Sequence, residues 1–139
     1  MKFEEYSISF ELKKNLEKQG FKRPTDIQFK AIPPILKGED VLAIAQTGTG
    51  KTAAFAIPVI HKIQIVKKTK RTNLIQCLVM VPTHELAQQI SEVFIALAKN
   101  TGVKTLGIIG GVDQAPQIAA LENGIDILVA TPGRLFDLV

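Results

Sequence analysis

Four nearly unbroken apolar runs constrain the fold of this chain more than any other feature. They cover residues 41–46, 74–81, 104–110 and 126–131. None shows the strict alternation of apolar and polar residues that is typical of a strand with one solvent-exposed face. Runs of this kind are typical of strands that are buried on both faces. We therefore predict an α/β fold in which these segments form a parallel sheet flanked by helices.

Segments with a helical pattern precede and separate the runs. Pro33 and Pro34 should end or kink the second of them early, because proline lacks an amide hydrogen. The predicted helices are 9–19 (Ser9 as cap, Phe10, Leu12 and Leu16 on its apolar face, Gly20 at its end), 25–36, 51–65, 84–99 and 113–123 (Asp113 as cap, Pro116 in the first turn). Parallel crossovers bring the loops that follow each strand to one edge of the sheet, where ligands bind in such folds.

Composition adds little to this picture. The 139 residues suit one domain, and the formal charge of +4 is a modest indication of an anionic partner such as a nucleic acid. The basic run at 66–71 lies between a helix and a strand, so we expect a solvated loop at the opposite edge. The single cysteine, Cys77, excludes an internal disulfide and fits a reducing, cytoplasmic setting. We expect no secretory signal and no membrane-spanning helix.

The sequence AQTGTGKT, residues 45–52, is close to the phosphate-binding pattern G-x-x-x-x-G-K-[ST], with alanine in the first position. Gly48 and Gly50 let backbone amides face the phosphates, Lys51 would neutralise their charge, and the Thr52 hydroxyl would bind Mg²⁺. A glycine-rich turn that binds nothing is the alternative, but this motif follows an apolar run and opens a helix. The predicted ATP and Mg²⁺ site comprises Ala45, Gln46, Thr47, Gly48, Thr49, Gly50, Lys51 and Thr52.

Upstream lies GFKRPTDIQ, residues 20–28, in which Gln28 has two interpretations. Thr25 and Gln28 have the spacing of a capping box, with reciprocal side-chain bonds to the first helical turn. A glutamine amide also donates and accepts at once, which matches adjacent donor and acceptor groups of adenine. The residues alone leave both roles of Gln28 open.

Taken in order, Phe3, GFKRPTDIQ, AQTGTGKT, PTHELA, GG and TPGR resemble the first half of a DEAD-box RNA helicase. The resemblance covers essentially the whole chain, and alanine is common at the first position of the phosphate loop in that family. It implies a RecA-like P-loop NTPase fold, truncated, with residues 1–139 as the N-terminal part of the first RecA-like domain. It also implies that Gln28 recognises adenine, aided by Thr25 and by contacts from Phe3, Phe21 or Arg23, and that Lys51 and Thr52 serve catalysis.

The resemblance further implies that PTHELA, GG and TPGR grip the sugar-phosphate backbone of RNA, largely without regard to sequence. Local alternatives exist: Thr83 as a helix cap, Glu85 as a favourable first-turn acid, and the glycine pair as an ordinary turn. His84 stands where the family usually has arginine, so the resemblance does not establish a phosphate contact at this position. The implied RNA-binding residues are Pro82, Thr83, His84, Glu85, Gly110, Gly111, Thr131, Pro132, Gly133 and Arg134.

The family's acidic DEAD motif, its SAT motif and its second domain would follow residue 139. We therefore expect this chain alone to hydrolyse ATP inefficiently, and we expect it to self-associate through an open edge of its sheet. A related DNA helicase or translocase is the nearest alternative enzyme. A module that binds ATP or RNA without turnover is the alternative from a different class.

Overall fold

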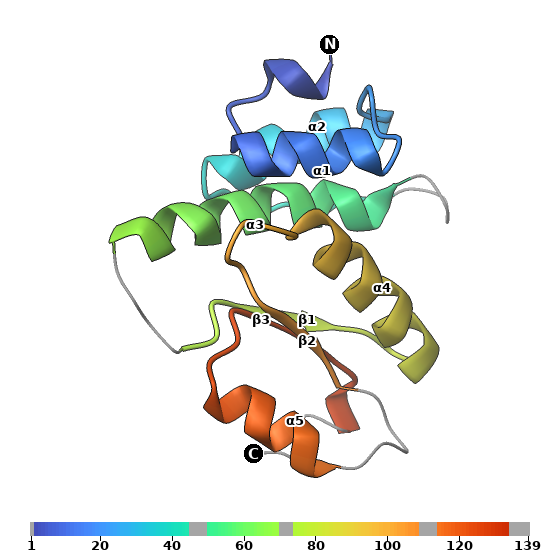
Figure 1. Ribbon diagram of the computed structural model, residues 1–139. Helices are drawn as coiled ribbons and strands as arrows, with labels where there is room; N and C mark the ends of the chain where they lie inside the picture. The colour runs from blue at the N-terminus through green and yellow to red at the C-terminus, as the bar shows by residue number, and fades with distance from the viewer. Residues whose placement is uncertain (1, 45–49, 70–73, 109–113, 134–139) are drawn as a thin grey trace.

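A parallel sheet with the strand order β1-β3-β2 lies at the centre of the computed structural model, which describes residues 2–44, 50–69, 74–108 and 114–133. Helices flank this sheet, and α1 and α2 lie beyond α3 on the side away from the strands (Figure 1). In chain order the elements are η1 (Phe3–Glu5), α1 (Phe10–Lys18), α2 (Asp26–Leu36), α3 (Lys51–Thr69), β1 (Cys77–Met80), α4 (His84–Leu97), β2 (Thr105–Gly107), α5 (Gln114–Glu122) and β3 (Ile127–Ala130).

Two apolar clusters join the sheet to its helical layers. The larger cluster lies between one face of the sheet and the helices α1 to α4, and it includes Leu12, Ile57 and Phe94. The smaller cluster lies on the opposite face, where Leu121 of α5 packs against Ile108 and Leu128. Figure 1 shows α3 and α4 on one side of the sheet and α5 on the other. The predicted parallel sheet flanked by helices is therefore confirmed.

Three of the four predicted strands are present. β3 pairs in parallel with β1 on one side and with β2 on the other, and all four of its residues are buried. β1 differs, because Cys77 and Val79 pack against the larger cluster whereas Leu78 and Met80 are 46% and 53% exposed. Burial on both faces thus holds for the central strand but not for β1, which has no strand on its outer side within the described chain.

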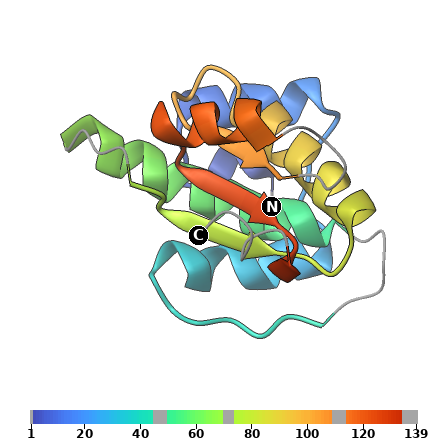
Figure 2. The same cartoon turned by 90° about the horizontal axis from the view of Figure 1, so that it is seen from below.

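The fourth predicted strand is wrong over residues 41–44, which belong to no strand of the sheet. Residues 45 and 46 of that prediction lie outside the described residues. Leu42 and Ile44 are 91% and 87% exposed. Figure 2 shows this segment on the side of β1 away from β3, apart from the sheet. A strand needs a neighbour for its backbone hydrogen bonds, and no described strand lies beside this segment.

The helix α1 begins and ends as its sequence predicts. The Ser9 hydroxyl accepts a 3.2 Å hydrogen bond from Leu12 N, and Gly20 follows the helix with a φ of +83°. Leu12 and Leu16 are fully buried, but Phe10 is 73% exposed, so its assignment to the apolar face is wrong. As the first residue of the helix, Phe10 precedes the turn that contacts the core.

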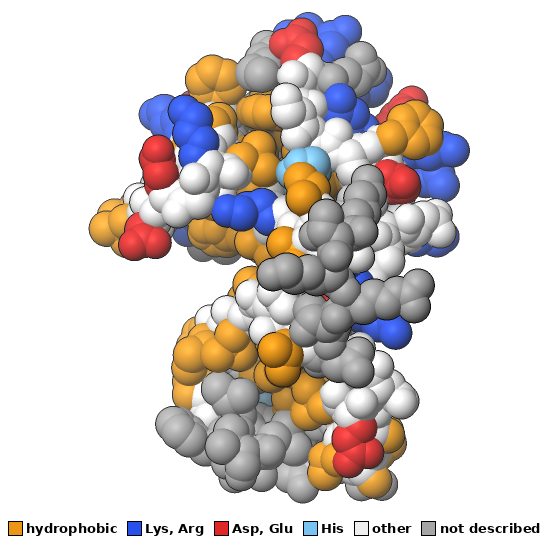
Figure 3. Space-filling view, turned by 90° about the vertical axis from the view of Figure 1, so that its left-hand side faces the viewer, with side chains coloured by type: hydrophobic (Ala, Val, Ile, Leu, Met, Phe, Trp, Pro, Cys, Tyr) orange, Lys and Arg blue, Asp and Glu red, His pale blue; other side chains and the backbone are white. Residues whose placement is uncertain are grey.

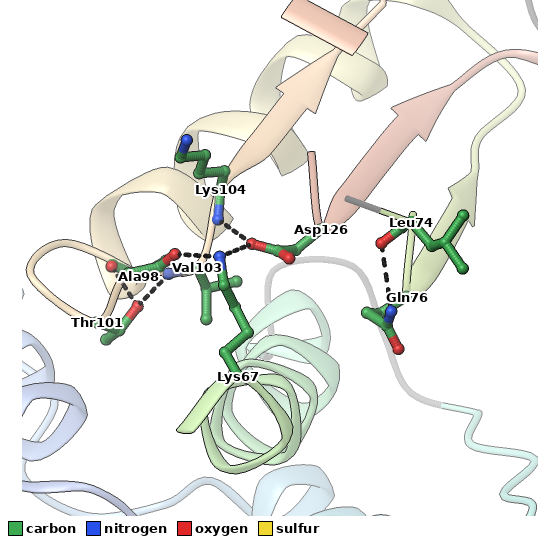
Figure 4. Close-up of polar contacts among 9 residues, drawn as sticks. Lys67, Leu74, Gln76, Ala98, Thr101, Val103, Lys104 and Asp126 are labelled. Carbon is green, nitrogen blue, oxygen red and sulfur yellow. Dashed lines mark hydrogen bonds and ion pairs between the residues drawn. The ribbon is translucent and has the colours of Figure 1, made fainter. Parts of the chain in front are cut away.

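The prolines do not end α2 early, because this helix continues through Pro33 and Pro34 to Leu36. The next helix is longer than predicted, and α3 takes up residues 66–69 of the basic run. Its Lys67 donates hydrogen bonds of 2.8 Å to the carboxylate of Asp126 and to the carbonyl oxygen of Gly102 (Figure 4). The prediction of a solvated loop is therefore wrong for 66–69, and 70–73 lie outside the described residues.

α4 and α5 confirm their predictions within two residues at each end, while Asp113 is not described.

No helix among the described residues has both the length and the apolar character needed to cross a membrane. Cys77, the single cysteine, is half-buried at the first position of β1. Burial raises the pKa of its thiol above the ordinary value, which favours the protonated, unreactive form. This agrees with a cysteine that packs as a small apolar side chain.

Candidate functional site

The loops that follow β1 and β3 lie at the same edge of the sheet. These strands are adjacent and parallel, and Val81 N donates a 3.0 Å hydrogen bond to Ala130 O where they end. Residues 82–85 therefore begin beside residues 131–133. A cavity of about 490 Å³ extends from Met80 and Val81 to Lys51 and Thr52. The structure thus brings the start of α3 and the predicted RNA-contacting loops after β1 and β3 to one region, as expected for a parallel sheet.

Gln28 forms the capping box that its sequence position predicts. Its side-chain oxygen accepts a 3.0 Å hydrogen bond from Thr25 N, and the Thr25 hydroxyl accepts a 3.4 Å bond from Gln28 N. These bonds satisfy amide groups at the N-terminus of α2 that have no partner within the helix. The local interpretation of this pair is therefore present in the structure.

The same side chain also reaches the end of the phosphate-binding motif. The Gln28 amide nitrogen donates a 3.1 Å hydrogen bond to the carbonyl oxygen of Gly50, and Gln28 is fully buried. Gly50 has a φ of +81°, and a Cβ atom built there would overlap that amide nitrogen. Glycine is thus required at this position by both its backbone angle and its neighbour. Sequence reasoning missed this link, which joins two motifs 22 residues apart.

The predicted adenine contacts fall into two groups. Thr25 and Gln28 lie against Gly50, whereas Phe3, Phe21 and Arg23 line a separate hollow of about 670 Å³. Phe3 is buried and meets Phe21 edge-on, with ring centroids 6.3 Å apart. Lysines at the rim make this hollow basic; they are Lys2, Lys13, Lys14 and Lys22. The hollow was not anticipated from the sequence, although two of its lysines are consecutive in α1 and the other two are the chain neighbours of Phe3 and Phe21.

Lys51 and Thr52 open α3, and both are half-buried at the mouth of the cavity beside β1. The N-terminus of a helix carries partial positive charge, which adds to the Lys51 ammonium in attracting phosphate. Among the described residues no three His, Cys, Asp or Glu side chains are grouped so as to hold a metal ion. A single hydroxyl at Thr52 fits Mg²⁺ that shares its coordination with phosphates and water. Ala45, Gln46, Thr47, Gly48 and Thr49 lie outside the described residues.

Residues 82–85, which follow β1 and Val81, are exposed, and a local hydrogen bond caps the helix that begins there. The Thr83 hydroxyl caps α4 by accepting a 3.2 Å hydrogen bond from Leu86 N, and Glu85 occupies the first turn. Both local alternatives for these residues are therefore present. Pro82 and His84 are exposed beside them. After β3, Thr131 is buried while Pro132 and Gly133 are exposed. Gly110, Gly111 and Arg134 lie outside the described residues.

Comparison with known proteins finds similarity to a family model, to curated proteins and to a solved structure. The model of the DEAD/DEAH box helicase family matches residues 25–139. The chain is 45% identical over its whole length to the DEAD-box ATP-dependent RNA helicase CshA of Streptococcus pneumoniae. It is 46% identical over 135 residues, or 97% of its length, to the ATP-dependent rRNA helicase rrp3 of Schizosaccharomyces pombe.

The fold also matches a solved structure. The crystal structure of a DEAD box protein from the hyperthermophile Methanococcus jannaschii aligns with 99% of this chain at a TM-score of 0.84 and 38% identity, and the aligned part is 36% of that protein. The predicted RecA-like fold is thereby confirmed. The chain spans only 26% of the length of the Streptococcus relative and 28% of the Schizosaccharomyces relative.

Proposed function

Because this chain belongs to the DEAD/DEAH box helicase family, we propose that it supplies the ATP-binding surface and part of the RNA-binding surface of an ATP-dependent RNA helicase. One observation carries the ATP-binding part of this proposal. The 3.1 Å hydrogen bond between Gln28 and Gly50 holds the N-terminus of α2 against the start of α3, beside Lys51 and Thr52. Two segments that contribute to one nucleotide site are thus held together before ATP arrives.

At this site Lys51 would contact the phosphates, and the N-terminus of α3 would add its positive dipole. The Thr52 hydroxyl would hold Mg²⁺, which supplies charge neutralisation when it is bound. Gln28 would recognise adenine, with Thr25 beside it and with Phe3, Phe21 or Arg23 contributing contact. The oxygen of the Gln28 amide accepts from Thr25 N and its nitrogen donates to Gly50 O, which leaves one lone pair and one N–H for a ligand. Because the side chain is fully buried, adenine recognition would require Gln28 to become accessible.

RNA would bind at the loops that follow β1 and β3. Thr83, His84 and Pro132 are exposed there, and hydroxyl and backbone groups at such loops bond to phosphate and sugar. These groups carry no base information, which supports binding that is largely independent of sequence. Gly110, Gly111, Gly133 and Arg134 complete the proposed surface.

We further propose a cytoplasmic setting and little ATP hydrolysis by the 139-residue chain alone. Phosphoryl transfer depends on groups that position the attacking water and stabilise the developing charge. The resemblance places those groups in motifs outside this sequence. Self-association through the open edge of β1 is the third part of the proposal, and it is supported by the exposure of Leu78 and Met80.

Titration of the chain with a fluorescent ATP analogue in the presence of Mg²⁺ tests the nucleotide site. Lys51→Ala should weaken binding strongly, whereas Lys62→Ala on an exposed part of the same helix should not. Equal affinity of wild type and Lys51→Ala would reject the site. RNA-stimulated turnover by the chain would contradict the proposed inactivity and would exclude a non-hydrolysing binding module. Comparison of RNA with DNA of the same sequence separates an RNA helicase from a DNA helicase.

A further inference from the structure

The hollow of about 670 Å³ is formed by the start of η1, by α1 and by residues 21–23. Backbone hydrogen bonds hold these segments together. Phe3 N donates to Lys22 O over 3.3 Å, and Phe21 N donates to Leu16 O over 2.9 Å. Phe3 is buried and meets Phe21 edge-on, so the hollow has an apolar base. The shape of the hollow is therefore set by contacts within the chain.

The net positive charge of the chain is concentrated around this hollow. Its charged lining residues are five cations, Lys2, Lys13, Lys14, Lys22 and Arg23, and one acid, Glu17. Their net charge of +4 equals the formal net charge of all 139 residues, so the rest of the chain carries equal numbers of positive and negative side chains. Figure 3 shows most Lys and Arg side chains of that face in the half that holds α1 to α3. A basic surface of this kind attracts an anionic partner.

Phe10 adds an aromatic surface to this charge. It is the first residue of α1, it is 73% exposed, and Lys14 Nζ lies 5.8 Å from the centroid of its ring. Proteins that bind single-stranded nucleic acids combine such rings, on which bases stack, with cations that neutralise phosphates. The exposed ring favours a nucleic-acid strand over an acidic peptide, which would engage the charges alone.

The α1 side of the hollow is separate from the sites proposed above. Figure 1 shows α1 beyond α3, on the side away from the strands whose following loops form the proposed RNA surface. Phe3, Phe21 and Arg23 are proposed adenine contacts. Lys2, Phe10 and Lys14 belong to neither of these sites, although they line the same hollow.

We propose that this hollow binds single-stranded RNA as a second RNA contact, with Phe10 stacked on a base and with Lys2, Lys14 and Lys22 at neighbouring phosphates. The inference rests on the proposed function in one respect, namely that RNA is a ligand of the protein. The hollow holds a part of the strand that the loops after β1 and β3 do not reach. Stacking and phosphate contacts carry little base information, so binding here is largely independent of sequence.

Fluorescence anisotropy with a labelled oligouridylate tests the charges. Lys2→Glu/Lys14→Glu should weaken binding at least about tenfold at low salt. It should also flatten the slope of log affinity against log salt by about one to two units, because each phosphate contact on a single strand contributes about 0.7 unit. Lys30→Glu/Lys62→Glu is the matched control, since it changes the net charge equally at exposed positions outside the hollow. Thermal unfolding of all variants verifies that the fold is retained.

Phe10→Ala tests the aromatic ring. It should weaken RNA binding about fivefold or more and leave the salt slope unchanged, because stacking releases no counterions. Phe10→Tyr keeps a ring and should bind RNA as the wild type does. Phe29→Ala is the matched control, because Phe29 is 53% exposed on α2 and lies outside the hollow. Oligouridylate that contains bromouridine should form a photo-cross-link with the peptide that holds Phe10.

The outcomes separate this inference from the proposed function. RNA binding that is unchanged in Lys2→Glu/Lys14→Glu and in Phe10→Ala would reject the hollow and leave the loops after β1 and β3 as the RNA surface. Cross-links at the hollow but none at residues 82–85 or 131–133 would support the hollow and reject those loops. A wild-type chain that binds no RNA would reject both.

Three further results would overturn the proposal. An equal loss of affinity in Lys30→Glu/Lys62→Glu would show a general charge effect. Displacement of the cross-linked RNA by the ATP analogue would assign the hollow to the nucleotide. Displacement by polyglutamate at the same concentration of charge as unlabelled RNA would assign it to an acidic protein segment.

Discussion

The side-chain amide nitrogen of Gln28 donates a hydrogen bond to the carbonyl oxygen of Gly50 over 3.1 Å. The donor lies in the first turn of α2 and the acceptor immediately precedes α3, so one buried side chain joins two helix N-termini. The same residue caps its own helix through Thr25. A residue that sequence motifs assign to a ligand is therefore also a structural link.

Gln28→Ala should destabilise the fold. The change removes the acceptor for Thr25 N, removes one of the two donors to Gly50 O and opens space at a fully buried position. We expect a loss of about 2–3 kcal/mol in the free energy of unfolding. Urea denaturation measures it, with Gln88→Ala on the exposed face of α4 as control. A loss no larger than that of the control would contradict the linking role.

Gly50→Ala should cost more than Gly20→Ala. Both glycines have a φ near the same positive value, +81° and +83°, so both substitutions bear the left-handed penalty of about 1–2 kcal/mol. Only at Gly50 does the new Cβ meet another side chain, since nothing lies within 4 Å of that position at Gly20. Denaturant unfolding of the two variants isolates the contact with Gln28. In a double-mutant cycle, Gln28→Ala should relieve part of the Gly50→Ala penalty, and strict additivity would refute the contact.

Lys67→Met should weaken the junction between α3 and the sheet. Lys67 Nζ lies 2.8 Å from the carboxylate of Asp126, which is 3% exposed, and it also bonds to Gly102 O (Figure 4). Without the ammonium, the bond from Lys104 N is the one that the described residues still supply to the buried carboxylate. Because Lys67 is partly exposed, we expect a loss of about 1–2 kcal/mol in thermal or urea unfolding. Lys62→Met, which removes an exposed 3.4 Å bond to Ile35 O, should have a smaller effect.

His84→Arg should tighten RNA binding and steepen its dependence on salt. Position 84 is exposed at the first residue of α4, where the family resemblance places a phosphate contact. An additional permanent cation at a phosphate raises the slope of log affinity against log salt by about one unit. Fluorescence anisotropy with labelled single-stranded RNA across a salt titration measures this slope. Gln89→Arg adds the same charge at another exposed position of α4, and an equal gain there would show a general charge effect.

Much of the sheet could be predicted because buried strands produce long apolar runs, and β3 satisfies that expectation at every residue. The same signal failed at residues 41–44. Apolar composition indicates that a segment can pair, but pairing also requires a partner strand at the correct place. Leu42 and Ile44 have the composition of a core strand and the exposure of a surface loop. The exposure of these two side chains is set by the absence of a described partner strand beside them, and their own residue types do not indicate it.

The helix caps at the site could also be predicted from the sequence. Thr25, Gln28 and Thr83 form the caps that their spacing predicts, because a cap depends on residues within one turn. The bond between Gln28 and Gly50 was not predictable in this way, since it depends on how α2 packs on α3. Likewise, the basic run at 66–71 gave no indication that Lys67 would reach Asp126, which is 59 residues away.

The order of strands in the sheet determines when the strands can pair during synthesis of the chain. β1 and β2 do not touch each other, and each pairs only with β3, the last described strand. On a ribosome, therefore, none of the strand pairings described here can form until residues 127–130 have emerged. Until then Cys77, Val79 and Leu106 have no strand partner in the sheet described here. The contacts between α2 and α3 can form earlier. Synthesis should thus yield a helical layer first and the sheet in one late step.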